Sequence, residues 1–147
     1  MSDKTRILFL STDNAARSQM AAAFAESFAA HLMEASSAGV EAAEAVHPYA
    51  VKVMNEDWLD ISGETPKAVT DAMLADVDLV ITLSEQARDR CPALPEGAEH
   101  RHWEIDDPKA AEGDEQAITN AFRSVQDDVK EQILFLMNEL RGAVADF

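Results

Sequence analysis

The sequence predicts an α/β protein with a four-stranded parallel sheet, and two observations indicate this class. Short apolar runs typical of buried strands alternate along the chain with longer stretches whose apolar residues recur at helical spacing. The 147 residues are 47% hydrophobic with only 5 Gly and 5 Pro, which favours one compact domain over residues 1–147 rather than a disordered segment. Such alternation is typical of parallel strands connected by crossover helices.

The N-terminal part supplies two strands and one helix. Ile7 to Leu10 is an apolar run of strand length. A helix is expected from about Arg17 to Leu32, because an apolar stripe recurs along this stretch every four residues. A weaker second strand covers Met33 to Ala38 and leads into a turn at Gly39.

The middle of the chain predicts a helix, a strand and a short helical segment. Pro48 favours a helix start, because proline suits the first helical turn. Trp58, near the end of this helix, is expected to be a core anchor or half-buried, the alternative being an exposed contact. Asp78 to Leu83 is apolar and β-branched, which makes it the clearest strand. Glu85 to Arg90 is long enough for one or two helical turns.

The C-terminal part predicts the fourth strand and a long helix. Glu99 to Ile105 alternates in polarity, with His100 and His102 on one face. Two histidines at this spacing suit a metal, but no third ligand lies nearby in the sequence, so no metal is expected. The strongest periodicity predicts an amphipathic helix from about Asp114 to Arg141 that stops at Gly142. We expect it to pack on the sheet, although its near-heptad spacing leaves a coiled coil open.

Charge and composition exclude several classes of function. The net charge of −16, from 28 acidic and 12 basic residues, predicts that the chain binds neither nucleic acid nor an anionic membrane. No run approaches the roughly 20 apolar residues of a membrane helix, and the N-terminal apolar run is too short for a signal peptide. The single cysteine, Cys91, excludes an internal disulfide. We therefore expect a cytoplasmic protein without a cofactor.

The segment after the first strand combines loop amides, a helix N-terminus and an arginine, which together suit an oxyanion. It resembles the phosphate loop of the low-molecular-weight protein tyrosine phosphatases and of the thioredoxin-coupled arsenate reductases with the same fold. Their loop reads cysteine, five residues, arginine, then serine or threonine. The corresponding anion-binding loop here consists of Ser11, Thr12, Asp13, Asn14, Ala15, Ala16, Arg17 and Ser18. The resemblance covers almost the whole chain and implies a flavodoxin-like three-layer sandwich with strand order 2-1-3-4.

Two positions of this loop depart from the family pattern. Ser11 replaces the nucleophilic cysteine, and a hydroxyl has no comparable ionised form at neutral pH without an adjacent base. Asp13 replaces a usual glycine, and aspartate tolerates left-handed backbone better than most residues. We expect the Asp13 carboxylate to pair with Arg17 or to cap the helix start.

The resemblance also assigns positions outside the loop. Asp107, followed by proline, matches the general acid of the family. Ser84 and Cys91 occupy the positions of two redox cysteines after the third strand. One thiol cannot form an internal disulfide relay, and Cys91 is expected to be an unreactive thiol, the alternative being a redox-sensitive one.

These departures lead to three hypotheses. The favoured one is a catalytically inactive family member that senses an oxyanion (phosphate, arsenate or sulfate) or binds a phosphoprotein, another protein partner or a second copy. The alternative is a divergent arsenate reductase or phosphotyrosine phosphatase that retains activity through its unusual loop. A third is a structural subunit that uses Trp58 and the long helix as an interface. Ser11 is the residue that discriminates between the first two.

Overall fold

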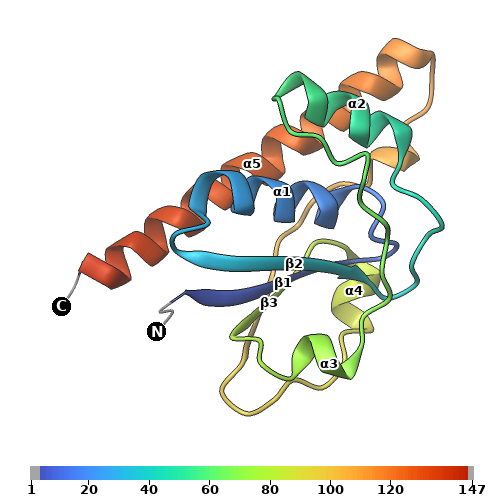
Figure 1. Cartoon of the computed structure of the whole chain (residues 1–147). Coiled ribbons are helices and arrows are strands. Elements are labelled where there is room, and N and C mark those ends of the chain that lie inside the picture. The colour runs from blue at the N-terminus through green and yellow to red at the C-terminus, as the bar shows by residue number, and fades with distance from the viewer. Residues whose placement is uncertain (1–3, 146–147) are drawn as a thin grey trace.

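Four parallel strands form the centre of the molecule in the computed structural model, which describes residues 4–145 (Figure 1). The strands are β1 (Thr5–Ser11), β2 (Met33–Gly39), β3 (Leu79–Thr82) and β4 (Glu99–His102). Their order in the sheet is β2-β1-β3-β4. The predicted strands and the implied order 2-1-3-4 are therefore confirmed.

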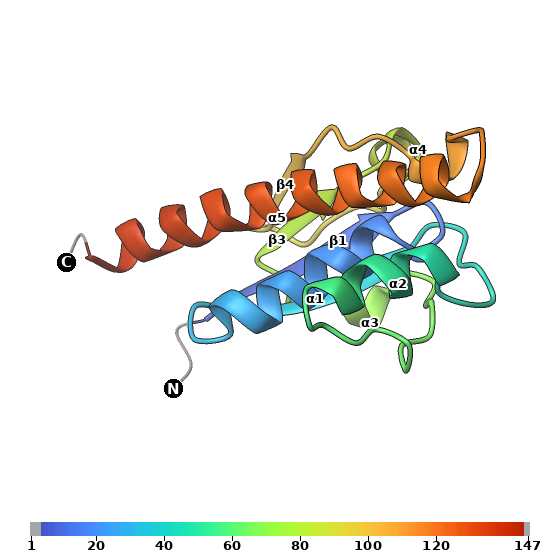
Figure 2. The same ribbon diagram turned by 90° about the horizontal axis from the view of Figure 1, so that it is seen from above.

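Helices cover both faces of the sheet and complete three layers (Figures 1 and 2). The upper face in Figure 1 carries the longer helices, α1 (Arg17–Ala29), α2 (Pro48–Glu56) and α5 (Glu115–Ala145). The lower face carries α3 (Asp71–Leu74) and α4 (Glu85–Asp89), and the 3-10 helix η1 (Pro108–Ala110) precedes α5. The α/β three-layer arrangement is thus confirmed, whereas α3 had no periodic signal in the sequence. Within residues 4–145, no helix combines the length and apolar content that a membrane span requires.

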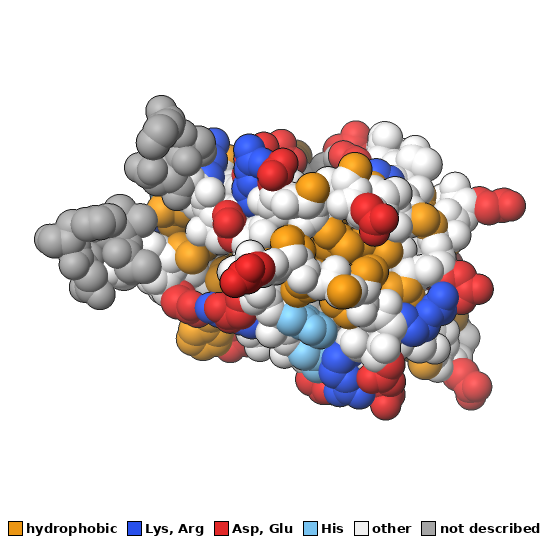
Figure 3. All heavy atoms as spheres, turned by 90° about the horizontal axis from the view of Figure 1, so that it is seen from below, with side chains coloured by type: hydrophobic (Ala, Val, Ile, Leu, Met, Phe, Trp, Pro, Cys, Tyr) orange, Lys and Arg blue, Asp and Glu red, His pale blue; other side chains and the backbone are white. Residues whose placement is uncertain are grey.

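The central strands are apolar because both of their faces are buried. Phe9 of β1 and Ile81 of β3 face the larger core beneath α1, α2 and α5, which also contains Phe24 and Phe122. Leu8 and Leu10 and their neighbours face a smaller core beneath the two short helices. Figure 3 shows hydrophobic atoms gathered in the middle of this lower side, with charged side chains around them.

Helix α5 confirms the predicted stripe and excludes the coiled-coil alternative within this chain. Its apolar residues are buried against α1 and α2: Phe122, Val125, Val129, Ile133 and Leu136. The side chain of Asp114 caps its start by accepting a hydrogen bond from the Ala117 N–H at 2.9 Å. The prediction that Gly142 stops the helix was wrong. Glycine ends a helix when it adopts the left-handed conformation, and Gly142 does not have a positive φ.

The prediction for Trp58 was also wrong, because its side chain is 94% exposed. The residue follows α2 in a left-handed conformation with φ of 63°, and its N–H donates to the Asn55 carbonyl at 3.0 Å. This turn directs the indole of Trp58 into solvent, whereas Ile61 is buried in the core. Glycine adopts this conformation without strain, whereas a residue with a side chain, such as tryptophan, rarely does.

Candidate functional site

The predicted anion loop connects the carboxyl end of β1 to the first residue of α1. Such sheets bind ligands at this edge. The loop leans on Gly39 at the end of β2, where a Cβ atom would come within 2.9 Å of the Asn14 nitrogen and of the Asp13 carbonyl carbon. A side chain at this position would push the loop away. The loop conformation therefore depends on the turn predicted at Gly39.

Ser11, the last residue of β1, has its hydroxyl held on two sides. The Ser11 and Ser18 Oγ atoms lie 2.6 Å apart, and the Asn14 N–H donates to Ser11 Oγ at 3.2 Å. Asn14 Nδ2 also donates to Ser18 Oγ at 2.6 Å. Both serines are buried. The structure thus places the replaced nucleophile position and Ser18 within hydrogen-bonding distance of each other.

Asn14 is the residue that holds the shape of the loop. Within the loop, Asn14 rather than Asp13 has left-handed backbone, with φ of 57°. Asparagine is tolerated there because its short side chain bonds locally. Its Oδ1 accepts from the Lys67 N–H at 3.0 Å and from Gln19 Nε2 at 3.1 Å. Sequence reasoning missed Gln19 and Lys67, which lie 5 and 53 positions from Asn14.

Arg17 lies beneath the loop and is only 7% exposed. Its Nη1 donates to the carbonyl oxygens of Leu83 at 3.3 Å and Ile105 at 3.2 Å, and its Nη2 lies 3.9 Å from Asp107 Oδ2. Burial lowers the pKa of the guanidinium, and Asp107 and Asp13 oppose that shift. An arginine keeps its charge in such a place, because the guanidinium is not deprotonated in proteins.

Asp13 has a different partner from the one predicted. Its Oδ2 forms an ion pair with the Lys109 ammonium, and its Oδ1 accepts from the Ala15 N–H at 3.1 Å. Both expected roles of Asp13 were wrong, because Arg17 pairs with Asp107 and no side chain caps the start of α1. Lys109 is brought to the loop by η1, which Asp107 caps by accepting from the Lys109 N–H at 3.0 Å. Its position two residues after Asp107 was the available sequence signal.

Ser84 and Cys91 lie at opposite ends of α4, and only Ser84 touches the loop. The Ser84 Oγ lies 2.8 Å from Thr12 Oγ1 and caps α4 by accepting from the Ala87 N–H. Cys91 is half-buried, and burial raises the pKa of its thiol. A raised pKa keeps the thiol protonated and weakens it as a nucleophile. Burial of this kind favours an unreactive Cys91, which stays a prediction.

The two histidines of β4 both contact the neighbouring strand β3. His100 Nε2 lies 3.0 Å and His102 Nδ1 lies 2.8 Å from the Thr82 hydroxyl of β3. Among residues 4–145, no group of three or more metal-ligating side chains is assembled. The pair of histidines is explained by this contact between adjacent strands.

His47 gives the site region a pH-dependent contribution to stability. Its Nδ1 accepts from the Tyr49 N–H at 3.2 Å, and its ring lies 4.6 Å from that of Phe122. Burial, followed by the charge of Lys109, lowers the pKa of His47. At a pH just below about 6.5, the ordinary pKa of histidine, the unfolded chain then binds more protons than the folded chain. The contribution of His47 to the free energy of unfolding is complete above about pH 6.5 and is lost as the pH falls below it.

We therefore expect the free energy of unfolding to fall between about pH 7.5 and about pH 5.5, and to fall less steeply in His47→Gln. Urea denaturation at both pH values measures this. Some slope should remain, since burial also lowers the pKa of His100. If the free energy of unfolding changed with pH equally in His47→Gln and in the native chain, the pH dependence could not be assigned to His47.

Comparison with known proteins places this site in a family. The chain belongs to the low-molecular-weight phosphotyrosine protein phosphatase family, whose model matches residues 6–145. It is 42% identical to the arsenate reductase of Bacillus licheniformis over 133 residues, covering 90% of this chain and 94% of that protein. It is 40% identical to the arsenate reductase of Halalkalibacterium halodurans over 131 residues, covering 89% and 94%.

A solved structure agrees with these relatives. The chain superposes on the Corynebacterium glutamicum thioredoxin-dependent arsenate reductase with a TM-score of 0.78 and 27% identity. The match covers 97% of this chain and 64% of that one, so this chain spans less than two thirds of the larger protein. The recognition of the family from the loop and its surroundings is confirmed.

The comparisons contradict the hypothesis of a catalytically inactive relative and favour its alternative. Proteins 40% and 42% identical along most of their length are arsenate reductases. The hypothesis rested on Ser11 and gave the missing thiolate more weight than the rest of the site. In the structure, the Ser11 hydroxyl is held by Ser18 and Asn14, and Arg17 lies buried beneath the loop.

Proposed function

We propose that this chain is an arsenate reductase that binds arsenate in the loop from Ser11 to Ser18. The observation that carries the proposal is the 40% and 42% identity to two arsenate reductases over most of the chain. The geometry supports it, because loop amides, the N-terminus of α1 and the charge of Arg17 converge at the carboxyl end of β1. These groups suit a tetrahedral oxyanion of either phosphate or arsenate.

In this proposal Ser11 is the oxygen nucleophile and Arg17 is the anion ligand. The Ser11 hydroxyl, held by Ser18 at 2.6 Å, forms an ester with arsenate, and water leaves. Arg17 binds the non-bridging oxygens through the guanidinium nitrogens that do not face Leu83 and Ile105. Asp107, whose carboxyl lies 3.9 Å from Arg17, donates a proton to the arsenate hydroxyl that leaves as water and takes up the proton of the Ser11 hydroxyl, so the step neither gains nor loses a proton.

The electrons come from outside the chain. Reduction of arsenate to arsenite takes two electrons, and Cys91 is the single thiol of the sequence. One external thiolate attacks arsenic and frees the Ser11 hydroxyl, and a second attacks the bound sulfur to release arsenite and a disulfide. The C. glutamicum relative is thioredoxin-dependent, and a dithiol protein of that kind supplies both thiols here. The cytoplasm, which keeps thiols reduced, is the fitting compartment.

The test follows arsenate-dependent oxidation of NADPH by the full chain with thioredoxin and thioredoxin reductase. We expect turnover in the native chain and in Cys91→Ser, and a loss of about 100-fold or more in Ser11→Ala. An aryl phosphate tested beside arsenate separates reductase from phosphatase activity. The proposal would be refuted if arsenate caused no oxidation of NADPH in the thioredoxin assay and no oxidation of dithiothreitol when that dithiol replaces thioredoxin. Equal turnover in Ser11→Ala and the native chain would also refute it.

Asp13 is expected to weaken binding of the anion. Its carboxylate adds negative charge to the loop and engages the ammonium of Lys109. Asp13→Asn keeps an oxygen for the Ala15 N–H and removes the charge, so phosphate should bind about tenfold more tightly. Calorimetric titration of phosphate measures this change. Asp128→Asn, an equal change of charge on the exposed side of α5, serves as the control, and equal affinities in the two variants would contradict the prediction.

A further inference from the structure

The outer edge of β2 has backbone groups that no other strand of the described sheet pairs with, although Met33 and Ser37 are only 2% and 4% exposed. Val40 N–H bonds to Ser11 of β1, whereas Gly39 N–H bonds outward to the Lys67 carbonyl at 2.8 Å. Because neighbouring residues of a strand point their backbone groups to opposite sides, Met33, Ala35 and Ser37 also face outward. The segment after α2 pairs with this edge only at Gly39, through a single bridge to Ala68.

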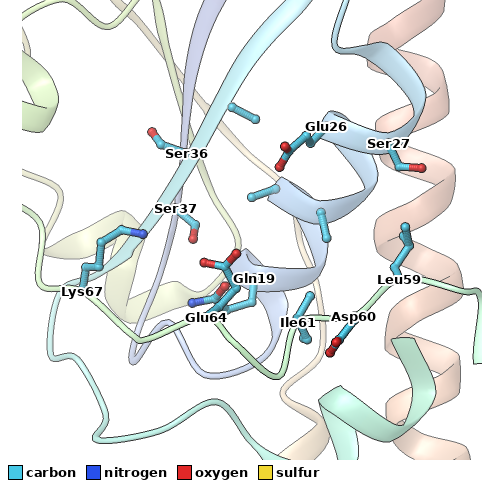
Figure 4. Close-up of a pocket in the computed structure, with 13 residues that line it drawn as sticks. Gln19, Glu26, Ser27, Ser36, Ser37, Leu59, Asp60, Ile61, Glu64 and Lys67 are labelled. Atoms are coloured by element: carbon cyan, nitrogen blue, oxygen red, sulfur yellow. The ribbon is translucent and has the colours of Figure 1, made fainter. Parts of the chain in front are cut away.

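A hollow flanks this edge on each face of the sheet. The upper hollow, of about 440 Å³, lies between α1, β2 and residues 59–67 (Figure 4). The lower hollow, of about 280 Å³, lies between β2 and α3. Ala35 and Ser36 line both hollows. An extended segment laid along β2 would direct alternate side chains into the upper and the lower hollow.

The small residues of β2 make room for such a segment. Natural sheets protect their edges with lysine, proline, bulges or a covering element. The strand reads MEASSAG, with neither lysine nor proline and with Glu34 as its one charged residue. Short side chains at Ala35, Ser36 and Ser37 leave the space on both faces open.

The two hollows select different side chains. Glu26, Asp60 and Glu64 line the upper hollow with Lys67, and Figure 4 shows the carboxylates of Glu26 and Glu64 directed into it. This excess of negative charge suits a lysine or arginine. In the lower hollow Arg6 pairs with both carboxylates, at 3.4 Å from Glu34 and 3.6 Å from Asp76. The remaining lining there is largely apolar and suits an aliphatic side chain: Ile7, Ala35, Ala72, Met73, Val77.

We propose that the edge of β2 binds an extended segment of a partner protein in which basic and aliphatic residues alternate. The segment adds a fifth strand, with its basic side chains in the upper hollow and its aliphatic side chains in the lower one. Charge complementarity selects this occupant over a second copy of the chain, because each copy carries −16 and offers no basic residue in β2. The proposal involves no arsenate, so it stands or fails independently of the reductase activity.

The probe is the capped peptide Lys-Val-Lys-Val-Lys-Val, titrated into the isotope-labelled full chain and followed by NMR. At saturation we expect hydrogen exchange of the Ala35 and Ser37 amides to slow at least about tenfold, because they gain hydrogen bonds. The amides of Glu34 and Ser36 face β1 already and should change little. This odd-even pattern distinguishes strand addition from attraction of the peptide to the acidic surface.

Two controls test the charge of the upper hollow. Glu64→Lys should weaken peptide binding at least about fivefold, whereas Glu96→Lys, an equal change in the turn before β4 at the opposite edge, should weaken it less than about twofold. The matched peptide Glu-Val-Glu-Val-Glu-Val should not bind. Unchanged exchange at Ala35 and Ser37, equal binding of the two peptides, or a homodimer formed through β2 in sedimentation would each overturn the proposal.

Discussion

Replacing Arg17 with glutamine is expected to weaken binding of arsenate and of phosphate by about 100-fold or more. Charge-assisted hydrogen bonds contribute about 1.5–3 kcal/mol each, and Arg17 is the buried cation beneath the loop. The variant also leaves the carbonyl oxygens of Leu83 and Ile105 with weaker donors. Phosphate titration by calorimetry and arsenate turnover measure the two effects separately.

Two further variants separate the geometry of Arg17 from its charge. Arg17→Lys keeps the charge but loses the planar fork, so affinity should fall between those of the native chain and Arg17→Gln. Arg6→Gln removes an exposed arginine that pairs with Glu34 and Asp76, and it should change phosphate affinity less than about twofold. Equal affinities in Arg17→Gln and Arg6→Gln would show that the anion binds elsewhere.

The second large effect concerns stability. Leu136 of α5 is 3% exposed within the larger core, and Leu136→Ala should lower the free energy of unfolding by about 2–5 kcal/mol. Phe135, the neighbouring residue, is 62% exposed, and Phe135→Ala should lower it by less than about 1 kcal/mol. Urea denaturation of both variants gives the comparison. A smaller loss of stability in Leu136→Ala than in Phe135→Ala would contradict the burial of Leu136 and the exposure of Phe135.

The strands and long helices were predictable because their apolar periodicity is a local property of the sequence. Ile7 to Leu10 and the stripe of α5 required no knowledge of the rest of the chain. The anion loop was predictable from the resemblance, because its residues are contiguous. The missed features depend instead on backbone conformation: Gly142 continues α5, and Trp58 turns outward on a left-handed turn.

The details of the site depend on contacts between residues far apart in sequence. Lys109 reaches Asp13 across 96 positions, and the Lys67 N–H reaches Asn14 across 53. No periodicity or motif within one segment encodes such pairs. The hypothesis of an inactive protein was wrong for a related reason. It rested on the single replacement at Ser11 and did not take account of the similarity of the rest of the chain to arsenate reductases.

The hydrogen bonds of Asn14 have a thermodynamic consequence for the anion loop and the upper hollow. Its side-chain oxygen accepts from Lys67 and Gln19, which both line the upper hollow, while its N–H holds the Ser11 hydroxyl. Occupation of the hollow and occupation of the loop therefore act on one shared residue. If either event alters the free energy of the other, reciprocity requires the same factor in both directions. Binding of an anion in the loop would then change the affinity for a partner strand by the same factor by which binding of that strand changes the affinity for the anion.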